Sequence, residues 1–454
     1  AIIGGGASGA VTLDILIKEN SFEKIDLFER RSSPGGIWLL DEEADDLKIP
    51  PGATAAELDP AINIPVEVLK IKQGLGESIK LPRSFVRRQQ RFTQTPAYAG
   101  IRTNIPEKFM TYSDKPNWKY LDKPDVDTLT TRDAVVNYIE DYIGPNKDHV
   151  TYNTTVEKIN KIGDSYELYL RQETNTVNED GEKFDVWWKE NYDAIVIATG
   201  HYHIPKIPDI PGLKEVFNNY PEKIEHAKSY RNNEKYKSKT VIVVGSRASG
   251  ADISNQIALV AKNVYNSRRT EYRFSPRQLS VAENAVTAPV ISRYELTNDG
   301  FKVHFENGLV IVNPDYVIYG TGYSFSYPFV RDLYPNFTNG HVVNSFQHTF
   351  FKDDPLISTV GIPTDGLSFR IFEYQAVLVS RFYAGKIKLP SKEEQQKWLD
   401  QLYKKYGETR AFYTIGIEKA ISYREDLTEL GGGVAPLNGN GRPFPILTLA
   451  ELEE

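Results

Sequence analysis

The amino-acid sequence predicts an α/β protein with two Rossmann-like dinucleotide-binding domains, the second inserted into the first. Two glycine-rich fingerprints, at 4–9 and 245–250, each follow an apolar stretch that is typical of a strand. Each fingerprint is matched further along the chain by an apolar strand that ends in Thr-Gly, at 193–200 and 315–322. The repeated pattern predicts two units with the same order of elements.

The composition is that of an ordinary globular protein, with 40% hydrophobic and 25% charged residues. The net charge of −7 gives no broad basic field for nucleic acid, and no apolar run is long enough for a transmembrane anchor. We expect a cytoplasmic protein. The sequence starts inside a strand without Met, so a targeting signal before Ala1 stays open. A homodimer is also an open alternative.

The first fingerprint lies in the expected strand–turn–helix context. Gly4 permits a tight turn, Gly6 lets the backbone approach a pyrophosphate, and Gly9 lets the helix pack closely on the strand. The apolar segment 10–18 predicts that helix, whose free N-terminal amides would hold phosphate groups. A merely structural glycine turn is the alternative, and the elements that follow argue against it.

The next predicted strand, at 25–29, ends in an acid, Glu29. A carboxylate there accepts hydrogen bonds from ribose hydroxyls and repels a 2′-phosphate. The first site is therefore predicted to take FAD or NAD rather than NADP.

The second fingerprint carries Arg247 where the pattern has its middle glycine. The strand predicted around 264–266 is followed by Arg268 and Arg269 and lacks a terminal acid. Guanidinium groups pair well with phosphates, so the second site is predicted to take NADP. Two alternatives stay open: a solvated surface pair at 268–269, and an Arg247 that crowds the phosphates.

Each unit also contains a predicted three-stranded meander between its helix and its Thr-Gly strand. Turn sequences such as Asn298-Asp-Gly300 separate the strands. The predicted strands lie at 150–159, 166–170 and 184–188 in the first unit and at 292–296, 301–305 and 309–312 in the second.

A proline-rich segment, 203–212, predicts an extended linker between the units, and the chain is expected to cross back near 323–329. These crossings give an NADPH-binding domain of residues 206–324. The FAD-binding domain then consists of residues 1–205 and 325–454.

Further motifs resemble those of the flavin-containing monooxygenases, in particular the soluble fungal members. They are the Gly-Gly-x-Trp of Gly35–Trp38 after the ribose-binding acid, the Thr-Asn pair of Thr103 and Asn104, the Asp-x-x-x-x-x-Thr-Gly-Tyr of Asp315–Tyr323, and the Glu373-Tyr-Gln-Ala376 at a helix start. The family's linker motif is matched at His226 and Tyr230, but Tyr220 and Glu222 stand where it has Phe and Gly.

The resemblance implies FAD and NADPH as cofactors and molecular oxygen as a substrate. NADPH reduces FAD, oxygen adds at flavin C4a to give a hydroperoxide, and the sulfur or nitrogen of a thiol, sulfide or amine takes up one oxygen atom. The cofactor-binding residues that the fingerprints and the resemblance imply are Gly4, Gly5, Gly6, Ala7, Ser8, Gly9, Glu29, Arg30, Gly36, Ile37, Trp38, Thr103, Asn104, Val156, Thr199, Gly200, Gly245, Ser246, Arg247, Ala248, Ser249, Gly250, Arg268, Arg269, Thr321, Gly322, Tyr323 and Gln375.

Asn104 is the candidate catalytic residue. Its amide can hold NADP⁺ or the peroxide by hydrogen bonds without donating an acidic proton. The alternative is a turn-forming Asn before Pro106.

Histidines do not predict a metal site in this chain. His201 and His203 face one side of a strand, but no third ligand with metal-binding spacing lies near them, so no metal is expected. Tyr202 and Tyr323 are expected to pack near the nucleotides.

Segment 42–98 resembles no motif, and we expect a loop-rich flap or surface insertion. Within it, Arg87, Arg88 and Arg91 are expected on a solvated loop. The glycine-rich loop 431–437 is a candidate wall of the substrate pocket.

Other functions remain as alternatives. A Baeyer–Villiger monooxygenase shares both fingerprints. The linker of that class carries a His-x-x-x-Trp motif, however, and this chain has Tyr230 at the position of the Trp. An uncoupled NADPH oxidase that releases hydrogen peroxide and a flavin-binding sensor without turnover also fit. A pyridine nucleotide–disulfide reductase shares the layout but needs a cysteine pair, and the chain has no cysteine.

Overall fold

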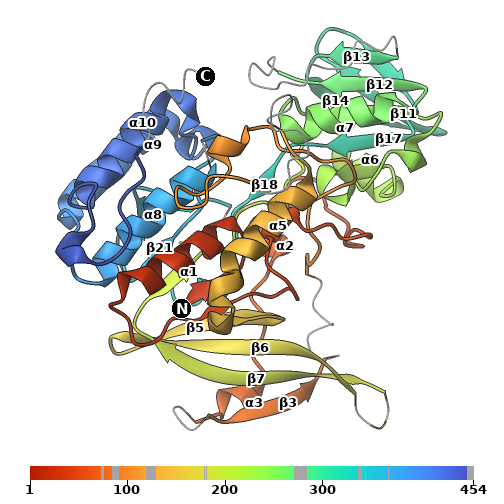
Figure 1. The fold of residues 1–454 in the computed structure, drawn as a ribbon. Coiled ribbons are helices and arrows are strands. Elements are labelled where there is room, and N and C mark those ends of the chain that lie inside the picture. Colours follow the sequence, from red (N-terminus) through yellow and green to blue (C-terminus); the bar gives the residue numbers. More distant parts are fainter. Residues whose placement is uncertain are drawn as a thin grey trace.

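A computed structural model describes residues 1–72, 76–83, 91–118, 129–177, 179, 181–269, 284–335, 340–342, 344–366 and 368–446. Two mostly parallel sheets organise the fold, and Figure 1 shows the second sheet set apart at the upper right. Among these described residues, no helix is both long and apolar enough to cross a bilayer.

The first sheet has seven strands in the order β19-β20-β21-β8-β1-β2-β4. The strands from β21 to β4 run parallel, and β19 and β20 are antiparallel additions at one edge. The bounds are β1 (Ile2–Ile3), β2 (Leu27–Phe28), β4 (Val150–Thr151), β8 (Ile195–Ile197), β19 (Ser345–Phe346), β20 (Phe350–Phe351) and β21 (Ile357–Thr359).

Helices cover one face of this sheet, and an antiparallel sheet covers the other. Helices α1 (Ala7–Glu19), α5 (Arg132–Ile143) and α8 (Ser368–Tyr383) pack together in one buried apolar cluster. Two further helices, α9 (Lys392–Tyr406) and α10 (Gly416–Leu430), follow near the C-terminus, and Ser391 with Glu394 forms the predicted capping box of α9. Helix α8 begins five residues before the predicted start at Glu373.

The antiparallel sheet corrects the prediction of one strand over 150–159. The chain breaks at Asn153, which has a left-handed φ of 54°, so that β4 joins the parallel sheet and a new strand starts at Thr154. The order is β3-β7-β6-β5, and β3 comes from the segment without a motif. The bounds are β3 (Ser78–Pro82), β5 (Thr154–Ile162), β6 (Ser165–Val177) and β7 (Lys183–Tyr192).

The second sheet is entirely parallel, in the order β10-β17-β11-β12-β13. A separate meander, β14-β15-β16, lies where the sequence predicts it. The bounds are β10 (Ile224–His226), β11 (Thr240–Val244), β12 (Asn263–Ser267), β13 (Ala285–Ala288), β14 (Ile291–Thr297), β15 (Gly300–Phe305), β16 (Val310–Val312), β17 (Tyr316–Tyr319), α6 (Leu213–Asn219) and α7 (Ala248–Ala258).

The two crossings between the sheets pair with each other. Strand β9 (Ile204–Pro205) leads to the second sheet and β18 (Tyr323–Ser324) leads back, as an antiparallel pair. All strands of the second sheet fall between 224 and 319, within the range predicted for the inserted domain, and the boundaries at 206 and 324 stay a prediction.

Short helices occupy the remaining connections. They are α2 (Ala55–Leu58) and α3 (Val66–Leu69), and the 3-10 helices Gly36–Trp38, Glu107–Phe109, Gly144–His149, Ala227–Ser229, Glu234–Tyr236, Pro328–Val330, Arg410–Phe412 and Leu437–Gly439.

Buried charges hold the C-terminal segment against the first sheet's helices. Arg442 is 6% exposed and pairs with Asp14 on α1 at 3.0 Å and with Glu373 on α8. Arg381 donates hydrogen bonds to the carbonyls of Gly431 and Gly433. These contacts place the 431–437 loop away from the space between the two sheets.

Candidate active site

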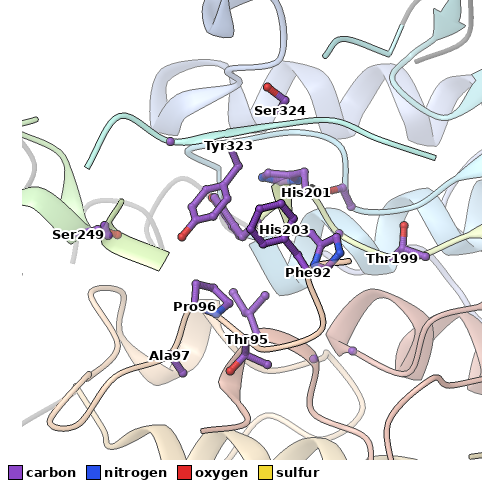
Figure 2. A pocket seen from close by; sticks show the side chains of 18 of the residues that line it. Phe92, Thr95, Pro96, Ala97, Thr199, His201, His203, Ser249, Tyr323 and Ser324 are labelled. Carbon is purple, nitrogen blue, oxygen red and sulfur yellow. Dashed lines mark hydrogen bonds between the residues drawn. The ribbon is translucent and has the colours of Figure 1, made fainter. Parts of the chain in front are cut away.

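A cavity of about 1690 Å³ lies between the two sheets. Both fingerprints open into it, as do the Thr-Gly turns that follow β8 and β17. The carboxyl ends of parallel strands are where ligands bind in open α/β sheets, because the turns there expose backbone donors. Figure 2 shows Thr199 and Ser249 on opposite sides of this space, with Tyr323 and His203 between them.

The first fingerprint forms a cradle that fits a dinucleotide phosphate. A Cβ on Gly9 would collide with the Gly4 carbonyl oxygen, so glycine lets α1 lie against the strand end. A Cβ on Gly36 would lie 3.1 Å from the Cα of Gly6, so two backbones meet at the cavity edge. Helix α1 has no side-chain cap at its N-terminus, which leaves its first amides for a ligand.

Glu29 lies where the sequence places the ribose-binding acid. Its carboxylate is 5% exposed, lines the cavity and accepts hydrogen bonds from the amides of Gly5 at 2.5 Å and Arg31 at 2.8 Å. Burial raises the pKa of Glu29, and these amides oppose that shift. The carboxylate retains lone pairs for a ribose, and that role stays a prediction.

The second fingerprint repeats the turn. A Cβ on Gly250 would collide with the Gly245 carbonyl oxygen, as at the first site, and α7 has no side-chain cap. The residue equivalent to Glu29 is Arg268, because Val244 pairs with Ser267 as Ile3 pairs with Phe28. Asn266 is fully buried within the strand and donates to the Gly245 carbonyl at 2.9 Å and to Ser254 Oγ at 3.1 Å. The turn is therefore held without a carboxylate.

The arginines of the second site face the cavity. Arg268 and Arg269 both line it, where a 2′-phosphate is predicted. Arg247 reaches across to the first half and pairs with Asp365, which also pairs with Arg410 at 2.8 Å. A phosphate role for Arg247 stays a prediction.

Aromatic side chains and imidazoles occupy the middle of the cavity. Tyr202 and Tyr323 line it as expected, with ring centroids 5.6 Å apart. His226 accepts a hydrogen bond from the Lys228 amide at Nδ1, so its Nε2 donates to the Gly322 carbonyl at 2.9 Å. Burial lowers the pKa of His226 to about 3, so the ring is neutral and fixed in one tautomer.

His201 and His203 also line the cavity. Burial lowers the pKa of His201 to about 4 and that of His203 well below its usual range. Within the described ranges, no group of three His, Cys, Asp or Glu residues is arranged to hold a metal ion.

Asn104 lines the cavity, and its side chain has no protein hydrogen-bond partner among the described residues. Its neighbour Thr103 points away: it is 1% exposed, and its Oγ1 accepts a hydrogen bond from the Thr130 amide at 2.9 Å. The pair predicted as cofactor-binding is thus divided. Thr103 anchors the segment, and Asn104 is presented to the cavity.

Gln375 does not line the cavity, contrary to the expected flavin contact. It is fully buried, accepts a hydrogen bond from the Gly361 amide at 3.0 Å, and donates to Thr349 Oγ1 at 3.0 Å and to the His348 carbonyl. Gly361 itself lines the cavity. Gln375 therefore holds the loop behind the surface that a cofactor would touch.

Most of the predicted cofactor residues meet at this cavity. Those that line it are Gly4, Gly6, Ala7, Ser8, Glu29, Arg30, Gly36, Ile37, Trp38, Asn104, Val156, Thr199, Gly200, Gly245, Ser246, Arg247, Ala248, Ser249, Arg268, Arg269, Thr321, Gly322 and Tyr323. Those that do not are Gly5, Gly9, Thr103, Gly250 and Gln375.

Sequence reasoning missed one wall of the cavity. Segment 91–98, expected within a flap or surface insertion, is largely buried and lines the cavity. Arg91 is not on a solvated loop but pairs with the buried Glu157 at 2.9 Å, whereas Arg87 and Arg88 lie outside the described residues. The run from Phe92 to Tyr98 carries aromatic and small residues, a signal too weak to place it.

Comparison with known proteins agrees with this architecture. The family model described as flavin-binding monooxygenase-like matches residues 87–278 and 289–432. The chain belongs to this family. Curated flavin-containing monooxygenases match nearly end to end, among them ustF2 of Aspergillus flavus, 27% identical over 94% of this chain and 90% of that protein, and FMO GS-OX5 of Arabidopsis thaliana, 28% identical over 95% and 82%.

Solved structures of other proteins share the fold of this flavin monooxygenase. The S-allyl-L-cysteine S-oxygenase from Allium sativum matches with a TM-score of 0.72, at 25% identity over 96% of this chain and 89% of that one. Cyclohexanone monooxygenase shares the fold, with a TM-score of 0.54 at 13% identity. The protein is an FAD-containing, NADPH-dependent monooxygenase, as its residues predict.

Proposed function

We propose that this flavin monooxygenase uses NADPH and molecular oxygen to oxygenate a soft nucleophile, the sulfur or nitrogen of a small sulfide, thiol or amine. The observation that carries the proposal is that both nucleotide fingerprints and the unpartnered amide of Asn104 open into one cavity. Bound FAD supplies hydride acceptance and oxygen transfer there. The chain supplies position, exclusion of water and hydrogen bonds.

The two fingerprints divide the binding work. The turn at Gly4–Gly9, the uncapped α1 and Glu29 would hold FAD, and the turn at Gly245–Gly250 with Arg268 would hold NADPH. Both turns face one cavity, so the two cofactors can meet in it.

The neutral side chains fit an oxygen-transfer step that avoids proton donation. Asn104 carries an amide that binds without acidity, and its segment is fixed by the Thr103–Thr130 contact. His226 is held neutral while it positions the Thr-Gly-Tyr turn through the Gly322 carbonyl. Such an arrangement orients a reactive group without protonating it.

A Baeyer–Villiger reaction is the competing oxygenation. The position that carries Trp in that class is Tyr230 here, buried and donating to Gln256 Oε1 at 2.8 Å. This supports heteroatom oxygenation over ketone oxygenation.

The test is the stoichiometry of NADPH consumption with purified, FAD-loaded protein. With methyl phenyl sulfide or N,N-dimethylaniline present, we expect oxygenated product for most of the NADPH consumed. Hydrogen peroxide as the sole product with both would overturn the proposal and identify an NADPH oxidase. Lactone formation from cyclohexanone, without sulfoxide, would identify the Baeyer–Villiger reaction.

The role of Asn104 is tested by Asn104→Ala. We expect FAD content to be retained and coupled product to fall about 100-fold, with hydrogen peroxide rising in its place, because one positioning contact is lost. Asn219→Ala, on the exposed face of α6, is the matched control and should behave as the parent protein. Coupled oxygenation by Asn104→Ala at the parental rate would remove Asn104 from the mechanism.

A further inference from the structure

The adenine end of the first site is expected beyond Glu29, on the side of β4. In this kind of fold the diphosphate lies at the glycine turn and the ribose lies at the acid after the second strand. The sheet order β1-β2-β4 then carries the base past the end of β4 at Thr151. The Thr154 amide donates to the Glu29 carbonyl at 2.8 Å, and Thr155 and Val156 line the cavity directly after it. The base is therefore expected over the start of β5.

A β-bulge interrupts β5 at this point. Val156 pairs with Leu170 and Lys158 pairs with Tyr169, so Glu157 is an extra residue in the register with β6. Val156 and Glu157 are both buried, although neighbours along a regular strand face opposite sides of the sheet. Glu157 does not itself line the cavity. The bulge thus turns a carboxylate into the interior, behind the cavity wall.

Two guanidinium groups converge on this carboxylate. Arg91 Nη1 donates to both oxygens of Glu157, at 3.0 and 2.9 Å, and Arg171 Nε donates to one of them at 2.7 Å. Burial opposes ionisation of Glu157, but the two guanidinium groups hold its pKa below the usual value, so the carboxylate is charged. Both arginines line the cavity. An acid outside the wall therefore fixes two guanidinium groups that form part of it.

The ion pairs continue away from the cavity. Arg171 donates to the buried Asp185 at 2.9 Å, and Asp185 also accepts a hydrogen bond from Arg83 Nε at 2.8 Å. Arg83 does not line the cavity, and its side chain is 13% exposed, against 20% for Arg91. The network thus has one arginine at the cavity and one at its far end, each paired with a buried acid.

The surroundings of Arg91 suit an aromatic base. Both hydrogen bonds to Glu157 come from Nη1, so the plane of the guanidinium and its second amino group stay available to a ligand. Val156 and Phe329 line the cavity and belong to one buried apolar cluster. A purine base can lie against an apolar surface and against a guanidinium plane, which attracts the face of an aromatic ring.

The charges nearby favour a neutral base over a further phosphate. Burial raises the pKa of Asp59, and Ser326, Arg91 and Arg30 oppose that shift, so these groups lie near one another. Asp59, Arg30 and Glu29 all line the cavity. A phosphate here would meet two acids as well as two arginines, whereas an uncharged base meets no such repulsion.

We propose that Arg91 binds the adenine base of FAD and that Glu157, placed by the bulge, holds its guanidinium for that contact. This end of the cavity then selects FAD over FMN, which lacks the adenosine. The inference extends the proposed placement of FAD at the first fingerprint. Arginine is required at this position, because a lysine can pair with Glu157 but has no planar group to lie against a base.

The experiment titrates the flavin-free full chain with FAD and with FMN and follows flavin fluorescence. For Arg91→Lys we expect the Kd for FAD to rise about tenfold and the Kd for FMN to stay unchanged. Arg83→Lys is the matched control, because it weakens the far end of the same network, and it should change neither Kd. Glu157→Gln should also weaken the binding of FAD and not that of FMN. ADP, which carries the adenosine without the flavin, should lose affinity for Arg91→Lys as FAD does.

Thermal unfolding of the flavin-free variants separates a lost contact from a damaged fold. Arg91→Lys and Arg83→Lys should lower Tm by similar amounts, with the loss of FAD affinity confined to Arg91→Lys. Arg91→Gln gives the same comparison if Arg91→Lys does not fold.

Three results would overturn the inference. They are an unchanged Kd for FAD in a folded Arg91 variant, an equal rise for FAD and FMN in that variant, and an equal rise for FAD in Arg83→Lys. An unchanged Kd for FAD in Glu157→Gln would remove the role of the bulge. Binding is measured without NADPH, oxygen or an oxygenation substrate, so a failure of the proposed function leaves this result standing.

Discussion

The two nucleotide-binding units share a turn and differ in what ends the following strand. Gly4 and Gly245 both adopt a left-handed φ, of 105° and 123°, and in each unit a later glycine is required beside the carbonyl of the first. The first unit has a carboxylate, Glu29, directly after β2, where it accepts a hydrogen bond from the Gly5 amide, whereas the second unit has Arg268 directly after β12. Backbone sterics thus dictate the turn, and the residue after the strand is predicted to decide which nucleotide is tolerated.

The halves also differ in how charge is buried. Arg442 closes a network with Asp14, Glu373 and Asp114 against the helices of the first sheet. In the second half, charged pairs such as Arg293–Glu295 lie at the surface, where Arg293 is 49% exposed.

The largest expected effect is on the buried network. Arg442→Leu removes the buried guanidinium that pairs with Glu373 and Asp14 and should lower the free energy of unfolding by about 3–5 kcal/mol. Arg293→Leu, the matched change at the exposed pair, should cost no more than about 1 kcal/mol. Urea unfolding of both variants measures this difference, and equal losses would contradict the contrast between the halves.

The next effect separates the two turns. Gly250→Ala forces a Cβ against the Gly245 carbonyl and displaces the start of α7. Because a displacement of about 1 Å can cost about 100-fold in rate, we expect reduction by NADPH to fall by that factor while FAD stays bound. Gly9→Ala should instead release FAD. Loss of FAD from Gly250→Ala would show that the two units do not fold independently.

A smaller effect depends on pH. The pKa of His226 is about 3 in the folded protein and near 6.5 when unfolded, so the unfolded state binds the extra proton between these values. The free energy of unfolding therefore falls as the pH falls below 6.5, by about 1.4 kcal/mol per pH unit from this group.

His226→Gln keeps a donor for the Gly322 carbonyl but does not titrate. Between pH 6.5 and 4.5 it should lose about 2 kcal/mol less stability than the parent protein. His149→Gln, at a partly exposed site, is the matched control. Parallel pH profiles of the parent and His226→Gln would show that His226 is not held neutral.

The smallest effect concerns cofactor choice. Arg268→Ala removes a guanidinium predicted to meet the 2′-phosphate and should raise the KM for NADPH about tenfold while leaving that for NADH unchanged. Arg293→Ala serves as a surface control on the same half. An equal rise for both nucleotides would place Arg268 outside the phosphate site.

The sequence was most informative where a backbone constraint leaves few residue choices. Most of the residues predicted from glycine spacing, the strand-end acid and the Thr-Gly turns do line the cavity, because a close backbone approach excludes other residues. It was least informative where a side chain acts through packing. Sequence motifs predict that Gln375 and Thr103 contact the cofactors. In the structure, each side chain instead points away from the cavity and accepts a hydrogen bond from a backbone amide.

By itself, the sequence determined the two nucleotide units, their order and their cofactors, since local turn sterics and strand periodicity encode them. The tertiary structure alone decided that Arg247 spans to Asp365 and that the 431–437 loop lies away from the cavity. It also decided that residues 92–98 line the cavity. These contacts join residues far apart in the chain, so no local pattern carries them, and they form only when the two halves pack together.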